Sequence, residues 1–187
     1  MTDTPGMMPV KIVVAGGFGS GKTTFVGSVS EITPLTTEAV LTTASLSVDD
    51  LAHVADKSTT TVAMDFGRIT LDEDLVLYMF GTPGQQRFWF MWDDLIRGAI
   101  GAVVLVDTRR LADSFAAVDY FETSGLPFVV GINGFGAQFP HRSQDVAEAL
   151  AIGPEVPLIP CDARDRESTK ATLVTLVEHA MARTCRF

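Results

Sequence analysis

Hydrophobic and polar positions along the chain predict a regular succession of strands and helices. Short apolar runs of strand length lie at 10–15, 62–69, 75–80, 99–107, 128–132 and 156–160. Segments with a helical pattern lie between or after them, at 25–29, 85–97, 111–123, 143–151 and 167–183. The runs 62–69 and 75–80 flank a short acidic turn, which predicts a β-hairpin.

This order of elements predicts an α/β protein with a three-layer fold. A six-stranded, mostly parallel sheet is expected, with one antiparallel strand from the hairpin and helices on both faces. We expect residues 1–9 to be a flexible tail and residues 10–187 to form a single domain. The prolines of the strand at 156–160 favour the edge of the sheet, and Ser143 is the expected cap of the helix at 143–151.

A glycine-rich loop connects the first strand to the first helix. Its Gly16, Gly21, Lys22 and Thr23 satisfy the spacing of a phosphate-binding loop, G-x-x-x-x-G-K-[ST]. In such a loop the glycines allow backbone N–H groups to surround a diphosphate, and the start of the helix adds its dipole. Lys22 is expected to reach the β- and γ-phosphates, and the Thr23 hydroxyl to bind Mg²⁺. The predicted phosphate-binding residues are Gly16, Gly19, Ser20, Gly21, Lys22, Thr23 and Thr24.

Composition and charge narrow the class of protein. Of 187 residues, 47 % are hydrophobic and 20 % are charged, which is typical of a globular chain. The net charge of −9 argues against general binding to nucleic acid or to anionic membranes. Two distant cysteines, no signal-peptide pattern and no lipid-attachment motif favour a cytoplasmic protein without its own membrane anchor. Peripheral recruitment to a membrane through a partner stays open.

A second loop with nucleotide chemistry follows the hairpin, at Gly81-Thr82-Pro83-Gly84-Gln85. Ligands of parallel sheets bind at the carboxyl ends of the strands, where this loop and the phosphate loop are both expected. In nucleotide triphosphatases a glycine at this place donates its N–H to the γ-phosphate, and a following glutamine orients the attacking water. Gly84 and Gln85 fit those roles. We therefore expect Gln85 and Lys22 to be the catalytic residues.

The stretches GGFGSGKTTFVGSVSEI, LTTEAV and FGTPGQQRFWFMWD resemble the motifs of Ras-like small GTPases, and the resemblance covers nearly the whole chain. The chain is most similar to the Arf and bacterial gliding-type branches, and to the small GTPases of actinobacterial conservon operons. The resemblance implies a GTP-controlled switch in a signalling system, with Mg²⁺ and GTP or GDP as its ligands. In such operons the family sits beside a roadblock-domain protein, which implies a protein partner of that type.

The resemblance also implies roles for residues outside the phosphate loop. Thr61 corresponds to the threonine that senses the γ-phosphate through Mg²⁺, although either of the two preceding threonines is an alternative. Asn133 corresponds to the Asn of the base-recognition motif Asn-Lys-X-Asp. Asp162 and Ala163 correspond to the last loop of the family, where a backbone N–H reads the guanine oxygen.

Two departures from the family pattern affect the metal and the base. The family carries an Asp at the position of Gly81 that holds Mg²⁺ through water, so the metal is expected to bind more weakly or through another group. Asp65 is a candidate substitute, with an ordinary strand-end or surface carboxylate as the favoured interpretation. Gly134 and Gly136 replace the Lys and Asp of the base motif, which lowers the expected affinity or selectivity for guanine by about one to several powers of ten. Asp162 is an alternative acceptor for the base.

The segment from Glu31 to Thr61 contains no arginine, so it supplies no arginine finger and intrinsic hydrolysis is expected to be slow. One alternative to a GTPase switch is a nucleotide-binding scaffold with negligible hydrolysis or relaxed base specificity, which Gly81, Gly134 and Gly136 favour. A small-molecule kinase shares the phosphate loop but needs an arginine-bearing lid, and it ranks last.

Five consecutive large apolar residues, Phe88-Trp89-Phe90-Met91-Trp92, lie in the helix predicted over 85–97. Only one face of a helix is buried against a sheet, so a core role accounts for two or three of them. Exposed apolar patches that contain Trp are typical of protein interfaces. We expect this segment to bind a protein partner in a nucleotide-dependent way.

Overall fold

The computed structural model describes residues 8–41, 60–84, 86–136 and 138–184, with the backbone alone at 36–41, 60–63, 86 and 87. The strands are β1 (Met8–Gly16), β2 (Leu35–Leu41), β3 (Thr60–Asp72), β4 (Leu75–Gly81), β5 (Ala99–Val106), β6 (Phe128–Asn133) and β7 (Leu158–Cys161). The α-helices are α1 (Lys22–Val29), α2 (Trp92–Ile96), α3 (Phe115–Ser124), α4 (Ser143–Ala149) and α5 (Arg166–Thr184). Two 3₁₀ helices precede α2 and α3, namely η2 (Gln86–Met91) and η3 (Thr108–Ser114).

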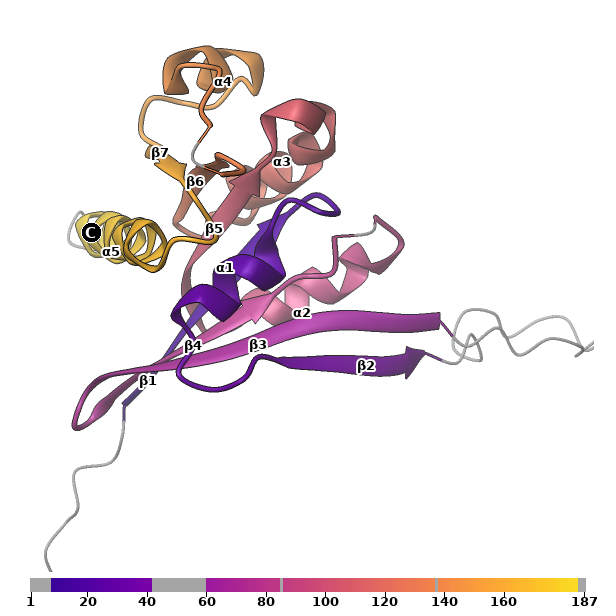
Figure 1. Ribbon diagram of the computed structural model, residues 1–187, viewed down its shortest axis with the longest axis vertical. Coiled ribbons are helices and arrows are strands. Elements are labelled where there is room, and N and C mark those ends of the chain that lie inside the picture. The colour runs from indigo at the N-terminus through magenta and orange to yellow at the C-terminus, as the bar shows by residue number, and fades with distance from the viewer. Residues whose placement is uncertain (1–7, 42–59, 85, 137, 185–187) are drawn as a thin grey trace, which may run out of the picture.

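The strands form one sheet in the order β2-β3-β4-β1-β5-β6-β7 (Figure 1). From β4 to β7 all neighbouring strands are parallel, and β3 runs antiparallel to β4 and to β2. The predicted fold class is therefore confirmed, with β3 as the antiparallel strand and β7 at the edge. The sheet has a seventh strand beyond the six expected. This strand, β2, has a threonine-rich sequence without clear alternation, and it is defined by its pairing with β3 from Leu35↔Phe66 to Leu41↔Thr60.

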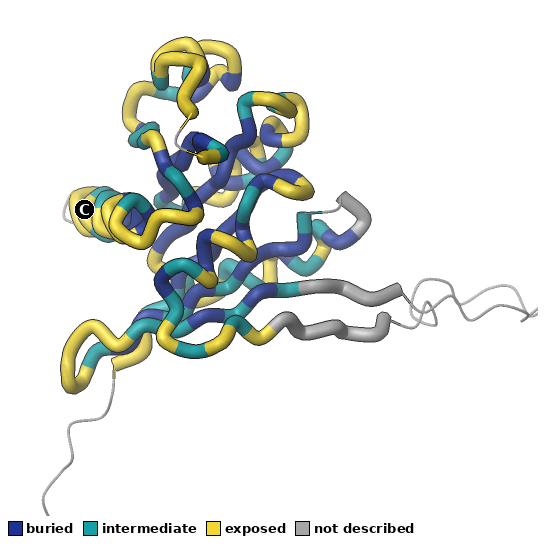
Figure 2. Tube along the Cα trace, in the orientation of Figure 1, coloured by how far each residue is buried: buried dark blue, intermediate teal, exposed yellow. Residues whose placement is uncertain are grey.

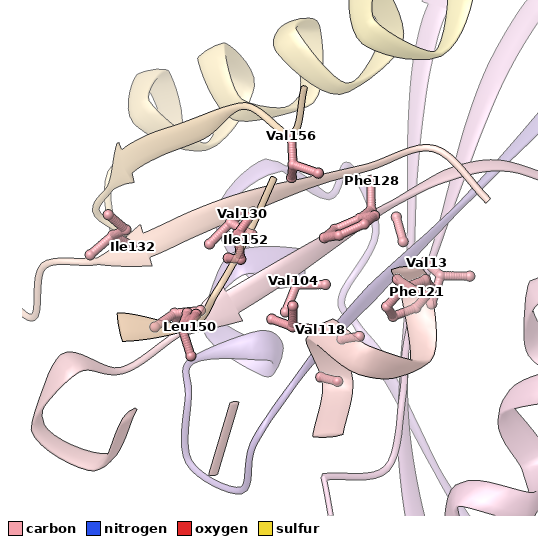
Figure 3. Close-up of a cluster of buried hydrophobic side chains, with 14 of the residues drawn as sticks. Val13, Val104, Val118, Phe121, Phe128, Val130, Ile132, Leu150, Ile152 and Val156 are labelled. Carbon is pink, nitrogen blue, oxygen red and sulfur yellow. The ribbon is translucent and has the colours of Figure 1, made fainter. Parts of the chain in front are cut away.

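Helices cover both faces of the sheet, as the continuous apolar strands require. Alternate residues of β1 and β5 point to opposite faces, so each face has its own buried cluster. Figure 3 shows the cluster beneath α3 and the segment that contains α4, where Phe121 and Val118 pack onto Val13 and Val104. The second cluster lies beneath α1 and α5 and includes Ile12, Val14, Phe25, Leu105, Leu173 and Leu176. Figure 2 shows the buried strands enclosed between more exposed helices.

Some predicted boundaries change in the structure. The helix expected at 85–97 is a 3₁₀ turn followed by the short α2, and the one expected at 111–123 begins as the 3₁₀ helix η3. Strand β1 begins at Met8, inside the expected tail. Ser143 is not the cap of α4, because the N-cap residue is Arg142 and no side chain caps this helix. The first turn is joined instead by the Arg142–Asp145 ion pair at 2.8 Å.

The topology places five connecting loops at one end of the sheet. The strands β1, β4, β5, β6 and β7 are parallel, so their carboxyl ends meet at the same end. The glycine-rich loop, the loop after β4 and the loops after β6 and β7 therefore come together there, as ligand sites of such sheets do. No helix within the described ranges is long and apolar enough to cross a bilayer.

Candidate functional site

The glycine-rich loop turns sharply between the end of β1 and the start of α1. Gly16, Gly19 and Gly21 all have positive φ, at 139°, 75° and 104°. At Gly16 a Cβ would also overlap the Leu105 carbonyl oxygen, and at Gly21 it would overlap the Asn133 amide nitrogen. A larger residue at Gly16 or Gly21 would meet both backbone strain and a clash, whereas at Gly19 it would meet backbone strain alone. The loop geometry thus agrees with the predicted phosphate-binding motif.

Lys22, the first residue of α1, folds back over this loop. Its Nζ donates hydrogen bonds to the carbonyl oxygens of Gly16 at 3.0 Å and Gly17 at 2.7 Å. Burial lowers the pKa of Lys22 from 10.5 to about 8, and the nearby Asp65 carboxylate opposes that shift. A buried ammonium with neutral oxygen partners is well suited to an incoming phosphate, because the phosphate would supply the missing negative charge.

Thr23 and Asp65 form a pair beside the lysine. The Thr23 hydroxyl donates a hydrogen bond to Oδ2 of Asp65 at 2.7 Å, across 42 residues of sequence. Asp65 is only 8 % exposed and lies inside β3, so it is neither a surface nor a strand-end carboxylate, and the favoured interpretation is wrong. Because the hydroxyl donates its hydrogen in this bond, the lone pairs of its oxygen stay available for a cation. The pair has the donor set that Mg²⁺ prefers.

Register explains how Asp65 reaches this place. Asp65 on β3 pairs directly with Gly81 on β4, the position where the family pattern has its metal-holding Asp. A Cβ at Gly81 would lie 3.0 Å from the Asp65 Cβ and 3.1 Å from its Oδ2. The carboxylate of the neighbouring strand therefore lies over the position that Gly81 leaves empty. This substitution depends on strand register, which the sequence pattern alone does not give.

An open pocket of about 280 Å³ joins these groups. Its lining residues are Phe18, Gly19, Gly21, Lys22, Thr23, Thr24, Asp65, Thr82 and Gly84. Two buried hydroxyl oxygens beside the loop, of Ser20 and Thr82, have no hydrogen-bond partner among the described residues. Buried polar atoms without partners are costly, so they point to a ligand or ordered water. Thr82 was missed in the sequence, where its only signal is its place directly after β4.

The side of the site predicted to recognise the base is built differently. Asn133 is buried, and its amide nitrogen donates to the Ser20 carbonyl at 2.9 Å. Its amide oxygen accepts from the Ala163 N–H at 3.2 Å. In this structure the Ala163 N–H therefore bonds to Asn133 and does not stand free for a guanine oxygen. Asp162 accepts the Arg164 N–H through Oδ1 at 3.0 Å.

Gln85 and Thr61 are the two remaining predicted residues. Gln85 lies outside the described residues. Thr61 is within β3, opposite Val40. Four positions separate it from Asp65, which is roughly 13 Å along an extended strand. The structure thus does not bring Thr61 next to Thr23. Within the described ranges no group of three His, Cys, Asp or Glu side chains could hold a metal. A metal here would therefore also need oxygen atoms from a bound molecule.

The apolar segment Phe88–Trp92 is largely part of the core. Trp92 is 1 % exposed and packs against Phe121 and Tyr120, with ring centroids 5.9 and 5.0 Å apart. Phe88 is also buried, and Trp89 is partly buried against Trp92. Phe90 is the residue of this segment that faces solvent, at 63 % exposed. The expectation that two or three of the five residues belong to the core agrees with this burial.

The loop geometry, the threonine–carboxylate pair and the sheet order define a P-loop nucleotide-binding protein with a GTPase-like fold. Residues 14–183 match the family described as conserved hypothetical ATP binding protein, and the chain belongs to this family. The uncharacterized protein MJ1339 of Methanocaldococcus jannaschii is 29 % identical over 126 residues, which cover 66 % of this chain and 69 % of that protein.

Two solved structures from T. maritima share the fold. One is the G domain of the FeoB iron transporter, with 14 % identity, a TM-score of 0.63, and coverage of 92 % of this chain and 99 % of that one. The other is the cytosolic domain of FeoB in its apo form, with 13 % identity, the same TM-score, and coverage of 92 % and 64 %. At such identities the likeness concerns the fold alone.

Proposed function

We propose that the protein is a Mg²⁺-dependent switch that binds and slowly hydrolyses a nucleoside triphosphate, with GTP and GDP as its expected ligands. The observation that carries this proposal is the convergence of Lys22, Thr23 and Asp65 on one pocket. A buried cation beside a glycine-rich loop and a hydroxyl–carboxylate pair next to it match what a Mg²⁺–polyphosphate needs. The G-domain neighbours favour guanine nucleotides, whereas the description of the family names ATP.

The metal would be held by Thr23 directly and by Asp65 directly or through water. Mg²⁺ keeps several waters and uses few protein ligands, which agrees with a site of two side chains plus phosphate oxygens. When bound, the ion would neutralise charge on the phosphates. Thr61 is proposed to approach only in the triphosphate state, because the structure holds it along β3.

Hydrolysis would use Gln85 to orient water and Gly84 to donate its N–H to the γ-phosphate. Gly84 is well placed for contact with the lysine, since a Cβ there would lie 2.8 Å from Lys22 Nζ. No arginine is available from residues 31–61, so turnover is expected to be slow without a partner. Gln85→Leu should sharply reduce phosphate release in a single-turnover assay.

A nucleotide-binding scaffold without meaningful hydrolysis is the second candidate. The observation that favours it is in the loop after β6, where the Asn133 amide nitrogen bonds to the Ser20 carbonyl and its amide oxygen to the Ala163 N–H. The same assay separates the two candidates. Phosphate release that is equally slow in wild type and Gln85→Leu supports the scaffold, and a large difference supports the enzyme.

A nucleotide-dependent protein interaction is part of the proposal. The resemblance to conservon-type GTPases suggests a roadblock-domain partner and a cytoplasmic signalling role. Phe90 supplies the exposed ring for such a contact, whereas Trp92 is committed to the core. Phe90→Ala should weaken capture of a purified roadblock protein and leave nucleotide affinity unchanged. Unchanged capture by Phe90→Ala would count against this surface.

Equilibrium binding of nucleotide with and without Mg²⁺ tests the proposal as a whole. Wild-type protein should bind a fluorescent triphosphate more tightly with Mg²⁺ than in EDTA. Lys22→Ala should lose most of this affinity in both conditions. An affinity that changes neither with Mg²⁺ nor with Lys22→Ala would contradict the proposed function.

A further inference from the structure

The two sides of the pocket indicate where the base of a bound nucleotide would lie. On one side the backbone of Gly84 packs against Phe18 and Lys22, because a Cβ there would lie within 3.0 Å of both. On the other side lie Asn133 and Ala163, which both approach Gly21. A nucleotide whose phosphates occupy the pocket therefore extends toward the loops after β6 and β7. This step rests on the proposed function.

The groups that usually read a purine edge are occupied in these loops. Asn133 uses its amide nitrogen on the Ser20 carbonyl and its amide oxygen on the Ala163 N–H. Asp162 accepts the Arg164 N–H, and its own N–H donates to the Ser168 hydroxyl at 2.9 Å. The segment 134–140 contains no Asp or Glu. No carboxylate of this segment is thus available to accept the paired N–H groups of guanine.

An aromatic ring lies where the base motif of Ras-like GTPases has a lysine side chain. A Cβ added to Gly134 would overlap ring atoms of Phe139, so the Phe139 ring packs directly against the Gly134 backbone. Gly136 has a φ of 76°, which turns the loop in a way that favours glycine. Phe139 is 41 % exposed and lies in the loop that follows β6. Glycine at position 134 is therefore a requirement of this aromatic packing.

The second ring of the loop is less available. Phe135 has the guanidinium of Arg109 over its face, with Arg109 Cζ 3.6 Å from the ring centroid. Arg109 is itself fixed by two hydrogen bonds to the Asp107 carboxylate, at 2.9 and 2.8 Å. This stack holds the Phe135 ring against Arg109 and so stabilises the loop. Phe139 is then the flat apolar surface that the loop offers to a ligand.

We infer that Phe139 binds the nucleotide base by stacking and that the site accepts adenine and guanine alike. Stacking does not depend on the hydrogen-bond pattern of the base edge, because every base has a π-face. Discrimination between purines normally comes from edge contacts, and the described groups best placed for them, the Asn133 amide and the Ala163 N–H, already bond to each other or to Ser20. The phosphates and the metal then provide most of the affinity, and the ring adds a contribution that is tolerant of base identity.

The test compares Mg²⁺ complexes of ATP, GTP and tripolyphosphate by calorimetry. Wild-type protein should bind ATP and GTP with affinities within about threefold of each other. Phe139→Ala should weaken both by roughly five- to 150-fold, the effect of one lost stack, and leave tripolyphosphate unchanged. Phe139→Trp should retain both affinities. Phe139→Leu, which keeps apolar bulk without a flat ring, should behave like Phe139→Ala.

Phe115→Ala is the matched control, because Phe115 is also 41 % exposed but lies at the start of α3. It should change none of the three affinities. A strong preference of wild type for GTP over ATP overturns the inference, and so does unchanged nucleotide binding by Phe139→Ala. Both results leave the proposed function intact if tripolyphosphate binds. Absence of binding by all three ligands would remove the proposed function and this inference together.

Discussion

Strands β4 and β6 end at the same end of the sheet, yet the loss of an expected charged group beside each is compensated in a different way. Near the phosphate loop, Gly81 lacks the expected carboxylate, and Asp65 of the adjacent strand takes its place beside Thr23. In the loop after β6, Gly134 lacks the expected side chain, and the ring of Phe139 fills the space. The first change keeps a carboxylate at the same place, whereas the second replaces a charged side chain with an apolar ring.

This difference follows from what lies beside each vacant position. Gly81 is in an antiparallel strand pair, so its direct partner presents a side chain to the same place. Gly134 follows the last residue of β6, where its backbone N–H bonds to the Cys161 carbonyl and no strand partner provides an acid. Register can therefore keep a carboxylate beside Thr23 through a change of sequence that would remove it from a loop.

The largest expected effect is on the phosphate side. Lys22→Ala should weaken binding of a Mg²⁺–nucleoside triphosphate by roughly thirtyfold to several thousandfold, because a buried charge partner of the phosphates is lost. Isothermal calorimetry measures this change. Lys11→Ala is a matched lysine control, since Lys11 donates to the Arg97 carbonyl away from the pocket. Comparable losses in the two variants would contradict the phosphate-binding role of Lys22.

The next effect tests whether Asp65 replaces the missing acid at Gly81. Asp65→Asn keeps an acceptor for the Thr23 hydroxyl but removes the charge, so the Mg²⁺-dependent gain in nucleotide affinity should fall by about tenfold or more. Nucleotide affinity in EDTA should change little. Titration of Mg²⁺ at fixed fluorescent nucleotide measures the difference.

A swap of the two positions is the sharper control. Asp65→Gly combined with Gly81→Asp moves the carboxylate to the neighbouring strand and removes the side chain that would crowd it at 3.0 Å. This double variant should recover most of the Mg²⁺ dependence that Asp65→Gly loses. Failure to recover it, in a protein with an unchanged circular dichroism spectrum, would argue that Asp65 acts through Thr23 alone.

Much of the fold was predictable because its signals are local. Buried parallel strands such as β5 and β6 are continuous apolar runs, and the β3–β4 hairpin has an acidic turn between two such runs. Strand β2 was not predictable in this way. Its threonine-rich sequence has little apolar alternation, so its pairing with β3 is decided by tertiary structure.

The candidate site likewise contains residues that local sequence predicts and residues that it does not. Gly16, Gly21 and Lys22 follow one another in a short motif, so sequence spacing alone places them. Asp65 is 42 residues from Thr23, and its contact depends on the register of β3 against β4. Similarly, glycine at position 134 indicates a missing side chain but does not identify Phe139 as its replacement. Contacts between separate elements are what the sequence pattern leaves undetermined.

Asn133 connects the glycine-rich loop to the loop after β7, and its loss should have a moderate effect on stability. Asn133→Ala removes the hydrogen bonds to the Ser20 carbonyl and the Ala163 N–H, leaving buried groups unsatisfied. We expect a loss of about 1–3 kcal/mol in the free energy of unfolding, measured by urea titration. Gln144→Ala is the control, since that amide is in an exposed contact with Glu148. An equally small loss in both variants would contradict the connecting role of Asn133.

The smallest effect concerns pH and is confined to the phosphate side. Burial lowers the pKa of Lys22 to about 8, whereas bound phosphates favour its charged form. Above pH 8 nucleotide binding must therefore take up a proton, so affinity should fall as pH rises, by at most about tenfold per pH unit. Measured in EDTA, affinity should be nearly flat from pH 7 to 7.5 and decline toward pH 9. Lys22→Arg stays charged throughout and should abolish that decline, whereas the same decline in Lys22→Arg would assign it to another group.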